Sequence, residues 1–317
     1  MDALHGFHFE GLPVHGRLLR LDEGWRELLA RHAHQPYAPP VRELLGQMTA
    51  AAVLLRSNIK FDGSLLLQVH GDGPVKLAVA EVRDGLGFRA TATVSGEVAD
   101  DAALNTLVDV HGHGRCSITL DPGRDRPGQQ PYQGVVPLRV PAGQPLRQLA
   151  PLLEHYMRQS EQLETRLLLA AGAHTAAGLL LQRLPGAGVE ARGAARYDEA
   201  FGHDEDFNRI AHLMATLTHD ELLQLDAHTV LHRLFWQERV QAHALRRPRF
   251  ACSCARERVR DMLRALGPHE VQGIVVERGE VEVGCEFCGQ RYRFDAVDVG
   301  GLFTPQRDLS AAPGSLQ

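Results

Sequence analysis

The spacing of apolar residues predicts two helices near the start of the chain. One helical pattern covers residues 21–34, and a second begins at Pro39. The apolar positions of the first pattern are Leu21, Trp25, Leu28 and Leu29. Those of the second pattern are Val41, Leu44, Leu45, Met48, Ala52 and Leu55.

From Phe61 onward the apolar period changes from helical spacing to alternation, which predicts short strands separated by turns. The predicted strands are SLLLQVH, VKLAVAEV, FRATATVSGEV, CSITLD and YQGVVPLRV. A helix is expected near LRQLAPLLEHYMRQS, followed by the apolar runs TRLLLAAG and AAGLLLQRL. Because strands and helices occur in separate runs, residues 1–190 are predicted to form an α+β domain of mixed sheets and helices.

Residues 191–247 are predicted to form a helical linker that follows the Gly/Ala-rich stretch LPGAGVEARGAAR. Its expected helices are DEDFNRIAHLMATL, HDELLQL and VLHRLFWQERV, and Thr218 with Glu221 has the spacing of a capping box. Isolated helices this short are marginal in water. Their stability must therefore come from packing against another part of the protein, and the cysteine module over residues 248–303 is the expected support.

Composition narrows the possible classes of protein. The 317 residues are 44% hydrophobic and 23% charged, which is typical of a soluble globular protein. No basic-then-apolar leader and no membrane-spanning apolar run is found, so a cytoplasmic protein without a membrane partner is expected. The net charge of −5 gives no bulk attraction to nucleic acid, and no phosphate-binding loop of the G-x-x-x-x-G-K-[ST] type is present.

Four of the five cysteines form one C-x-C and one C-x-x-C motif. Cys252 and Cys254 are followed by residues 255–284, and Cys285 and Cys288 come next. Two short pairs separated by a few tens of residues match a four-cysteine Zn²⁺ site, because Zn²⁺ prefers four soft ligands in a tetrahedron. Residues 248–303 are therefore predicted to form a small zinc domain holding one Zn²⁺ per chain.

Other interpretations of the cysteines remain open. The four could be buried thiols, or His243 or His269 could replace one of them as a ligand. A thioredoxin-like redox motif would need CEFC at the start of a helix, whereas VVERGEVEVGCEFCGQRYRF predicts a hairpin, a turn and another strand. Cys116, within CSITL, is expected to be a small core residue on a strand.

Several motifs along almost the whole chain resemble those of the heat shock protein 33 family of bacterial redox-regulated chaperones. The motifs are KFDG (60–63), GDGP (71–74), YQGVV (132–136), SEQL with Thr165 and Arg166, ELLQL (221–225), VLHRLF (230–235), F-x-C-x-C (250–254) and CEFCGQRYRF (285–294). The chain departs from the family's usual pattern at Met157 and Glu164 and in an apparent loop insertion, RDRPGQQP. None of these departures touches the four cysteines.

The resemblance implies an ATP-independent holdase chaperone and not an enzyme. The reduced, zinc-bound form would be inactive. Oxidation would pair Cys252 with Cys254 and Cys285 with Cys288, release zinc, unfold the linker and give a homodimer that holds unfolded client proteins. Unfolding of the linker would expose a set of apolar residues as a client-binding surface. These residues are Phe207, Ile210, Leu213, Met214, Leu231, Leu234, Phe235 and Trp236.

Two functions of other classes remain as alternatives. A constitutive zinc ribbon would bind RNA or a translation factor in the reduced state, with strong salt dependence. A thiol oxidoreductase would turn over disulfide substrates through one low-pKa cysteine. The acidic balance and the sequence context of CEFC count against both, so no nucleic-acid partner is expected. Residues 304–317 are expected to be a disordered tail.

Overall fold

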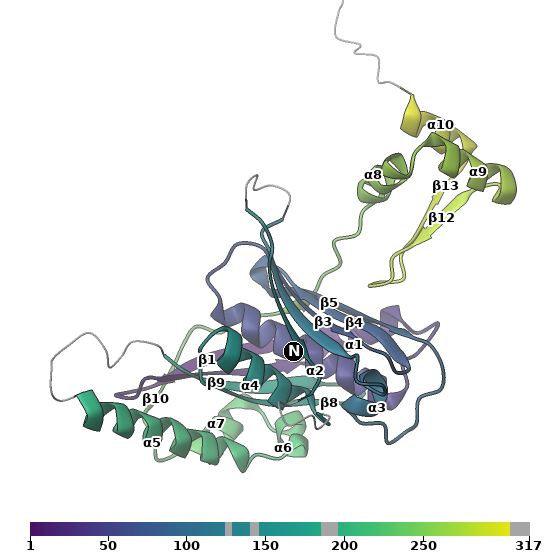
Figure 1. Ribbon diagram of the computed structural model, residues 1–317. Helices are drawn as coiled ribbons and strands as arrows, with labels where there is room; N and C mark the ends of the chain where they lie inside the picture. The colour runs from purple at the N-terminus through teal and green to yellow at the C-terminus, as the bar shows by residue number, and fades with distance from the viewer. Residues whose placement is uncertain (124–128, 140–145, 185–195, 305–317) are drawn as a thin grey trace, which may run out of the picture. The chain divides into compact units, whose positions relative to one another are not determined.

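The computed structural model describes residues 1–123, 129–139, 146–184 and 196–304 (Figure 1). The chain divides into two compact units, Met1–Cys252 and Ser253–Gln317. Both units combine helices with antiparallel strands, which confirms the predicted α+β class. Most of the Gly/Ala-rich stretch before the linker, and the tail beyond Thr304, lie outside the described residues.

The first sheet of the larger unit, called sheet A, has five strands in the order β10-β1-β2-β9-β8. Its strands are β1 (Ala3–Phe9), β2 (Val14–Leu21), β8 (Thr165–Ala171), β9 (Ala176–Arg183) and β10 (Val240–Ala242). Every neighbouring pair in this sheet is antiparallel.

Strands β1 and β2 precede the first helix, which corrects the expectation that the chain begins with helices. The predicted helix over 21–34 is α1 (Glu23–Arg31), and Leu21 ends the strand before it. The buried carboxylate of Asp2 accepts the backbone N–H groups of Asp22, Glu23 and Gly24 at 2.7–2.8 Å. The helix therefore starts where Asp2, which directly precedes β1, satisfies its first backbone donors, and helical periodicity cannot reveal such a distant contact.

The second sheet, called sheet B, has six strands in the order β11-β5-β4-β3-β6-β7. Its strands are β3 (Ser64–His70), β4 (Val75–Val82), β5 (Gly87–Val94), β6 (Arg115–Asp121), β7 (Tyr132–Pro137) and β11 (Arg249–Phe250). Five of them are the strands predicted from alternation. The sixth, β11, was not predicted, because it contributes only two residues and pairs in parallel with β5.

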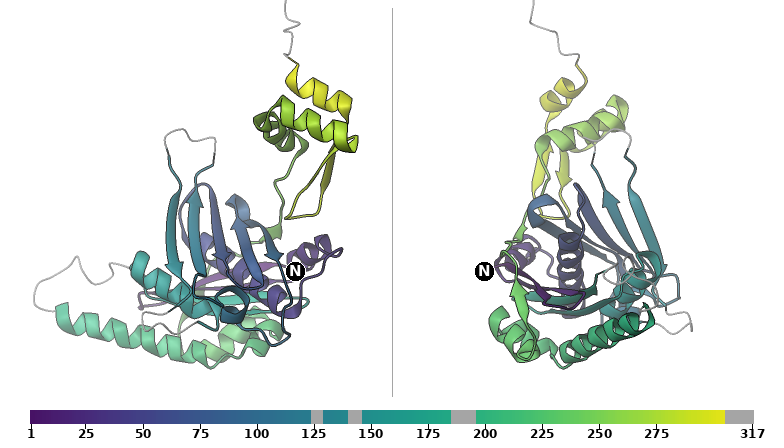
Figure 2. Two further views of the ribbon diagram at one scale, coloured as in Figure 1. Left: turned by 45° about the vertical axis from the view of Figure 1, so that its right-hand side comes forward. Right: turned by 90° about the vertical axis from the view of Figure 1, so that its left-hand side faces the viewer.

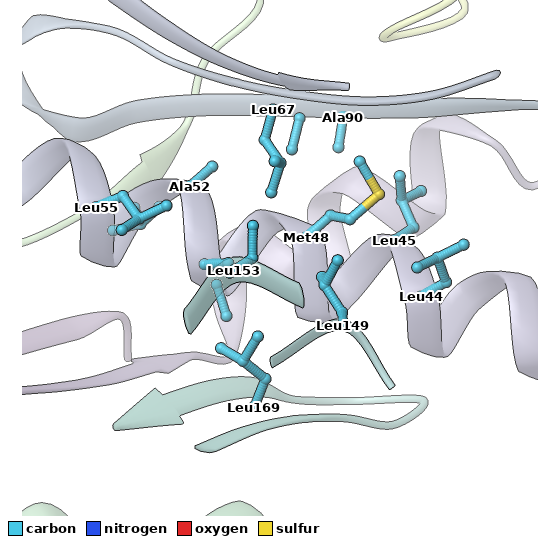
Figure 3. Close-up of a cluster of buried hydrophobic side chains, with 14 of the residues drawn as sticks. Leu44, Leu45, Met48, Ala52, Leu55, Leu67, Ala90, Leu149, Leu153 and Leu169 are labelled. Atoms are coloured by element: carbon cyan, nitrogen blue, oxygen red, sulfur yellow. The ribbon is translucent and has the colours of Figure 1, made fainter. Parts of the chain in front are cut away.

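Helix α2 (Pro39–Asn58) packs between the two sheets and organises the main core (Figure 3). Leu67 and Ala90 approach it from sheet B, and Leu169 lies on the opposite side, in sheet A. Helix α4 (Leu149–Ser160) closes this core with Leu149 and Leu153. Because α2 is covered on both sides, residues outside its predicted apolar face are also buried, and these include Ala50, Ala51, Val53 and Leu54.

Three helices of the linker cover the other face of sheet A (Figure 2). The apolar support of these helices is therefore sheet A, which corrects the expectation that the cysteine module supports them. They are α5 (Arg196–Ala215), α6 (His219–Gln224) and α7 (Ala227–Phe235). The predicted capping box is confirmed, since Thr218 caps Glu221 N–H and the Glu221 carboxylate accepts from Thr218 N–H. The helical pattern does not continue to residue 247, because the chain turns into β10 and pairs with β1.

The smaller unit contains three helices and one hairpin in its described residues. These are α8 (Arg256–Leu266), α9 (Pro268–Arg278), β12 (Val281–Gly284), β13 (Arg291–Phe294) and α10 (Ala296–Phe303). The prediction of strand at VVER is wrong, because Val275–Arg278 form the last turn of α9 and Gly279 ends it with a positive φ. The buried apolar residues of this unit are Leu263, Val271, Val281, Phe294, Val299 and Leu302.

Candidate metal centre

The C-x-x-C pair lies in a tight turn at the end of the β12–β13 hairpin. The carbonyl of Cys285 accepts the N–H of Cys288 at 3.3 Å and that of Gly289 at 2.8 Å. Cys285 N–H donates to the carbonyl of Gln290 at 2.9 Å. Gly289 has φ +68°, a conformation that favours glycine. This local structure places both sulfurs on the same turn.

The C-x-C pair directly follows β11 on the edge of sheet B. Phe250 pairs with Phe88 in register, and the N–H of Ala251 donates to the carbonyl of Phe88 at 2.9 Å. The rings of Phe88 and Phe250 meet edge to face, with centroids 6.5 Å apart. Cys252 therefore leaves the sheet at a fixed point, two residues before Cys254.

The four sulfurs lie within 4.8 Å of one another, so they can hold one metal ion together. The sulfurs of Cys254 and Cys288 are 3.3 Å apart. Cys288 is buried and the other three cysteines are half-buried. Within the described ranges, no cysteine is in a disulfide and no other cluster of three or more metal-ligating side chains occurs. His243 and His269 are accordingly not part of this group.

Two side chains that sequence reasoning missed contact the cysteines. Arg89 donates from Nη1 to the sulfur of Cys252 at 3.8 Å. Tyr292 forms a side-chain hydrogen bond with Cys254, and this bond is the main reason why the pKa of Tyr292 lies above its ordinary value. The alternation in FRATATV placed Arg89 on a strand, but no local signal showed that residue 252 would lie beside it.

The fifth cysteine, Cys116, lies in the core as predicted. Its side chain is 1% exposed on β6, opposite Val69 of β3. Burial raises the pKa of its thiol to about 12, so it carries almost no thiolate at neutral pH. Cys116 is therefore chemically distinct from the four clustered cysteines.

Comparison with known proteins identifies the family. A family model described as Hsp33 protein matches residues 2–295. The chain belongs to the Hsp33 family. The 33 kDa chaperonin of Chromobacterium violaceum is 43% identical over 302 residues, covering 95% of this chain and 94% of the relative. The 33 kDa chaperonin of Sodalis glossinidius is 40% identical over 305 residues, with the same coverage.

The fold comparison agrees with the Hsp33 assignment. The crystal structure of a 33 kDa chaperonin from Thermotoga maritima matches with a TM-score of 0.73 and 21% sequence identity. The match covers 95% of this chain and 98% of that chain. Hsp33 proteins are chaperones and not enzymes, and a chaperone role includes binding of unfolded client proteins. Among the described residues, no helix has the length and apolar character needed to cross a bilayer.

The residues predicted to form a client surface after linker unfolding are mostly covered in this structure. Those buried against sheet A are Phe207, Ile210, Met214, Leu234 and Phe235. Leu213 and Leu231 are partly buried against the same cluster. Trp236 differs, because its side chain is already 68% exposed and needs no unfolding to reach solvent.

Proposed function

We propose that this Hsp33 protein is a redox-regulated, ATP-independent holdase whose reduced form is held inactive by one Zn²⁺. The observation that carries the proposal is the convergence of four thiols, from two sequence-distant pairs, in a cluster from which the other cysteine is excluded. A reducing cytosol would keep these thiols available for a metal.

The cysteine cluster fits the size and chemistry of a tetrahedral zinc site. A Zn–S bond of about 2.3 Å places tetrahedral sulfurs about 3.8 Å apart. The observed cluster, with its 3.3 Å pair and its upper limit of 4.8 Å, brackets that spacing. Zinc would supply folding free energy and keep the sulfurs as thiolates, and Cys252, Cys254, Cys285 and Cys288 would hold it.

Zinc would contribute most to the stability of the smaller unit, because that unit has only a small hydrophobic core. Its buried cluster contains six apolar side chains, and Val276 and Val297 are more than 80% exposed. Units this small usually depend on metals or disulfides for stability. Loss of zinc should therefore unfold residues after Cys252.

Peroxide supplies the oxidant for the proposed switch. One thiolate sulfur attacks an oxygen of hydrogen peroxide, the O–O bond breaks, and a sulfenic acid and hydroxide form. A neighbouring thiol then attacks the sulfenic sulfur, an S–S bond forms and water leaves. The hydroxide takes up a proton, so each disulfide consumes two thiols and one peroxide and yields two waters. We propose that Cys285 pairs with Cys288 and Cys252 with Cys254, since each pair stays close along the chain after the metal has left.

Release of the linker would supply the client-binding surface. Helices α5–α7 cover apolar side chains of sheet A, among them Phe7, Phe9, Val14 and Leu18. Detachment of these helices would expose both the sheet face and the helix residues that now cover it. An exposed apolar surface of this extent binds other apolar chains, and we propose that unfolded clients and a second oxidised copy of this chain are its partners.

The test compares client protection with zinc release. Light scattering would follow the aggregation of a heat-unfolding client with reduced, zinc-loaded protein and with peroxide-treated protein, while a chromogenic chelator counts released zinc. We expect protection only after oxidation, with about one zinc released per chain. Cys285→Ser with Cys288→Ser should abolish the gain, and Cys116→Ala, outside the cluster, should keep it. Peroxide-dependent protection by the double variant would falsify the proposal.

A further inference from the structure

An ion-paired arginine contacts the sulfur of Cys252, the first of the four clustered cysteines. Arg89 reaches this sulfur from the adjacent strand, β5, with a 3.8 Å separation between Nη1 and Sγ. The Arg89 side chain is only 16% exposed, so its position is fixed by packing and by ion pairing. Sequence spacing gave no indication of this contact.

A buried carboxylate holds Arg89 in place. Glu81 lies on β4 directly opposite Arg89 in the antiparallel register, and its side chain is 4% exposed. Arg89 Nε donates to one carboxylate oxygen of Glu81 at 2.7 Å, while Arg83 Nε donates to the other oxygen at 2.5 Å. One carboxylate thus faces two guanidinium groups, so the cluster of Glu81, Arg83 and Arg89 has a net positive charge. Arg89 Nη2 also pairs with the Glu81 carboxylate, and Arg89 Nη1 is directed at Cys252.

The pairing of β11 with β5 places Cys252 beside the Arg89 guanidinium. Strand β11 pairs in parallel with β5, Phe250 packs on Phe88, and the N–H of Ala251 donates to the carbonyl of Phe88. These contacts fix the backbone one residue before Cys252. The contact from Arg89 then acts on the Cys252 sulfur itself.

We propose that Arg89 is a positioning residue for the Cys252 ligand, anchored by Glu81, and that its N–H···S hydrogen bond strengthens metal retention. The inference rests on the metal centre of the proposed function. Four thiolates around one divalent cation leave a net negative charge, which a guanidinium donor offsets. Partners of this kind outside the ligand set orient ligands, and their loss typically weakens metal binding by about 10- to 100-fold.

Arg89→Met, Arg89→Lys and Arg83→Met form a matched set of variants in the full chain. Arg83→Met is the control, because it also removes a guanidinium from Glu81 but does not involve the arginine that contacts Cys252. Lysine keeps the charge but lacks the planar fork that serves Glu81 and Cys252 together. Circular dichroism would verify that each variant is folded.

Cobalt(II), a spectroscopic substitute for zinc, and competition for zinc with a chromogenic chelator are the two readouts. Loss of an N–H···S bond raises the energy of the sulfur lone pair, so the sulfur-to-cobalt charge-transfer band should move to longer wavelength in Arg89→Met. Zinc affinity should fall by about tenfold in the same variant. Arg89→Lys should show a smaller change in both readouts, and Arg83→Met should match the wild type.

The outcomes separate this inference from the proposed function. An unshifted band and unchanged zinc affinity in Arg89→Met would overturn the role of Arg89, as would equal changes in Arg83→Met. If Arg89→Met does not fold, Arg89→Lys decides, and a wild-type band in that variant overturns the inference. Absence of a tetrahedral thiolate spectrum in the wild type would overturn the metal centre itself.

Discussion

Replacing Phe235 with alanine should partly activate the reduced protein, because this ring is a main contact between the linker and sheet A. Phe235 is 2% exposed. Its ring meets Phe9 edge to face with centroids 5.0 Å apart, and the ring of Phe7 lies 6.1 Å away. Truncating a buried phenylalanine costs about 3–5 kcal/mol, including the cavity left behind. If the substitution destabilises only the docked state, even 3 kcal/mol raises the population of the undocked linker by about 100-fold.

Trp236 provides the matched control for this prediction. It is the next residue and larger, but its side chain is 68% exposed, so Trp236→Ala should change stability by no more than about 0.5 kcal/mol. Hydrogen exchange of the α7 amides would measure linker opening, and light scattering with a heat-unfolding client would measure protection without oxidant. The reasoning is refuted if Phe235→Ala exchanges and protects like the wild type, or if Trp236→Ala has the same effect.

Two further predictions concern the polar contacts and the pH dependence of the larger unit. Arg20 Nη1 donates to the carbonyls of Leu223 and Leu225 at 2.6 and 3.4 Å, so Arg20→Met should destabilise the end of α6 by about 1–3 kcal/mol. Faster hydrogen exchange over 219–225 checks this, and unchanged exchange contradicts it. Burial lowers the pKa of His15 to about 4 from an ordinary 6.5, so between these values the unfolded chain binds a proton that the folded chain does not. Stability should therefore fall as pH drops through this window, by at most about 3 kcal/mol and less where solvent screens the ring. Urea unfolding at several pH values should show a shallower fall for His15→Gln, and an identical fall would refute the assignment.

The sequence was most informative where local periodicity and burial agree. Alternation located the five longer strands of sheet B, and the Thr218–Glu221 spacing located the start of α6, because both signals are complete within a few residues. Strands β10 and β11 were missed because they are three and two residues long and are defined by partners more than 100 residues away.

The cysteine cluster shows the same division between local and distant information. Cysteine spacing was enough to predict the four clustered side chains, since each pair places its own sulfurs close together. The contact from Arg89 could not be predicted, because it depends on the register of β11 on β5 and of β4 on β5. A partner outside the ligand set is specified by tertiary pairing and leaves no spacing in the sequence.

The two short strands also suggest how loss of a metal could reach the linker. Between the end of α7 and Cys252, the chain pairs with β1 through Val240–Ala242 and with β5 through Arg249–Phe250. Leu4 and Arg246 add one bridge between these two attachments. Strands of two or three residues contribute few hydrogen bonds and hold only while the chain on either side is ordered. We propose that unfolding after Cys252 removes this support first from β11 and then from β10, so that α7 loses the strand pairing that follows its C-terminal end.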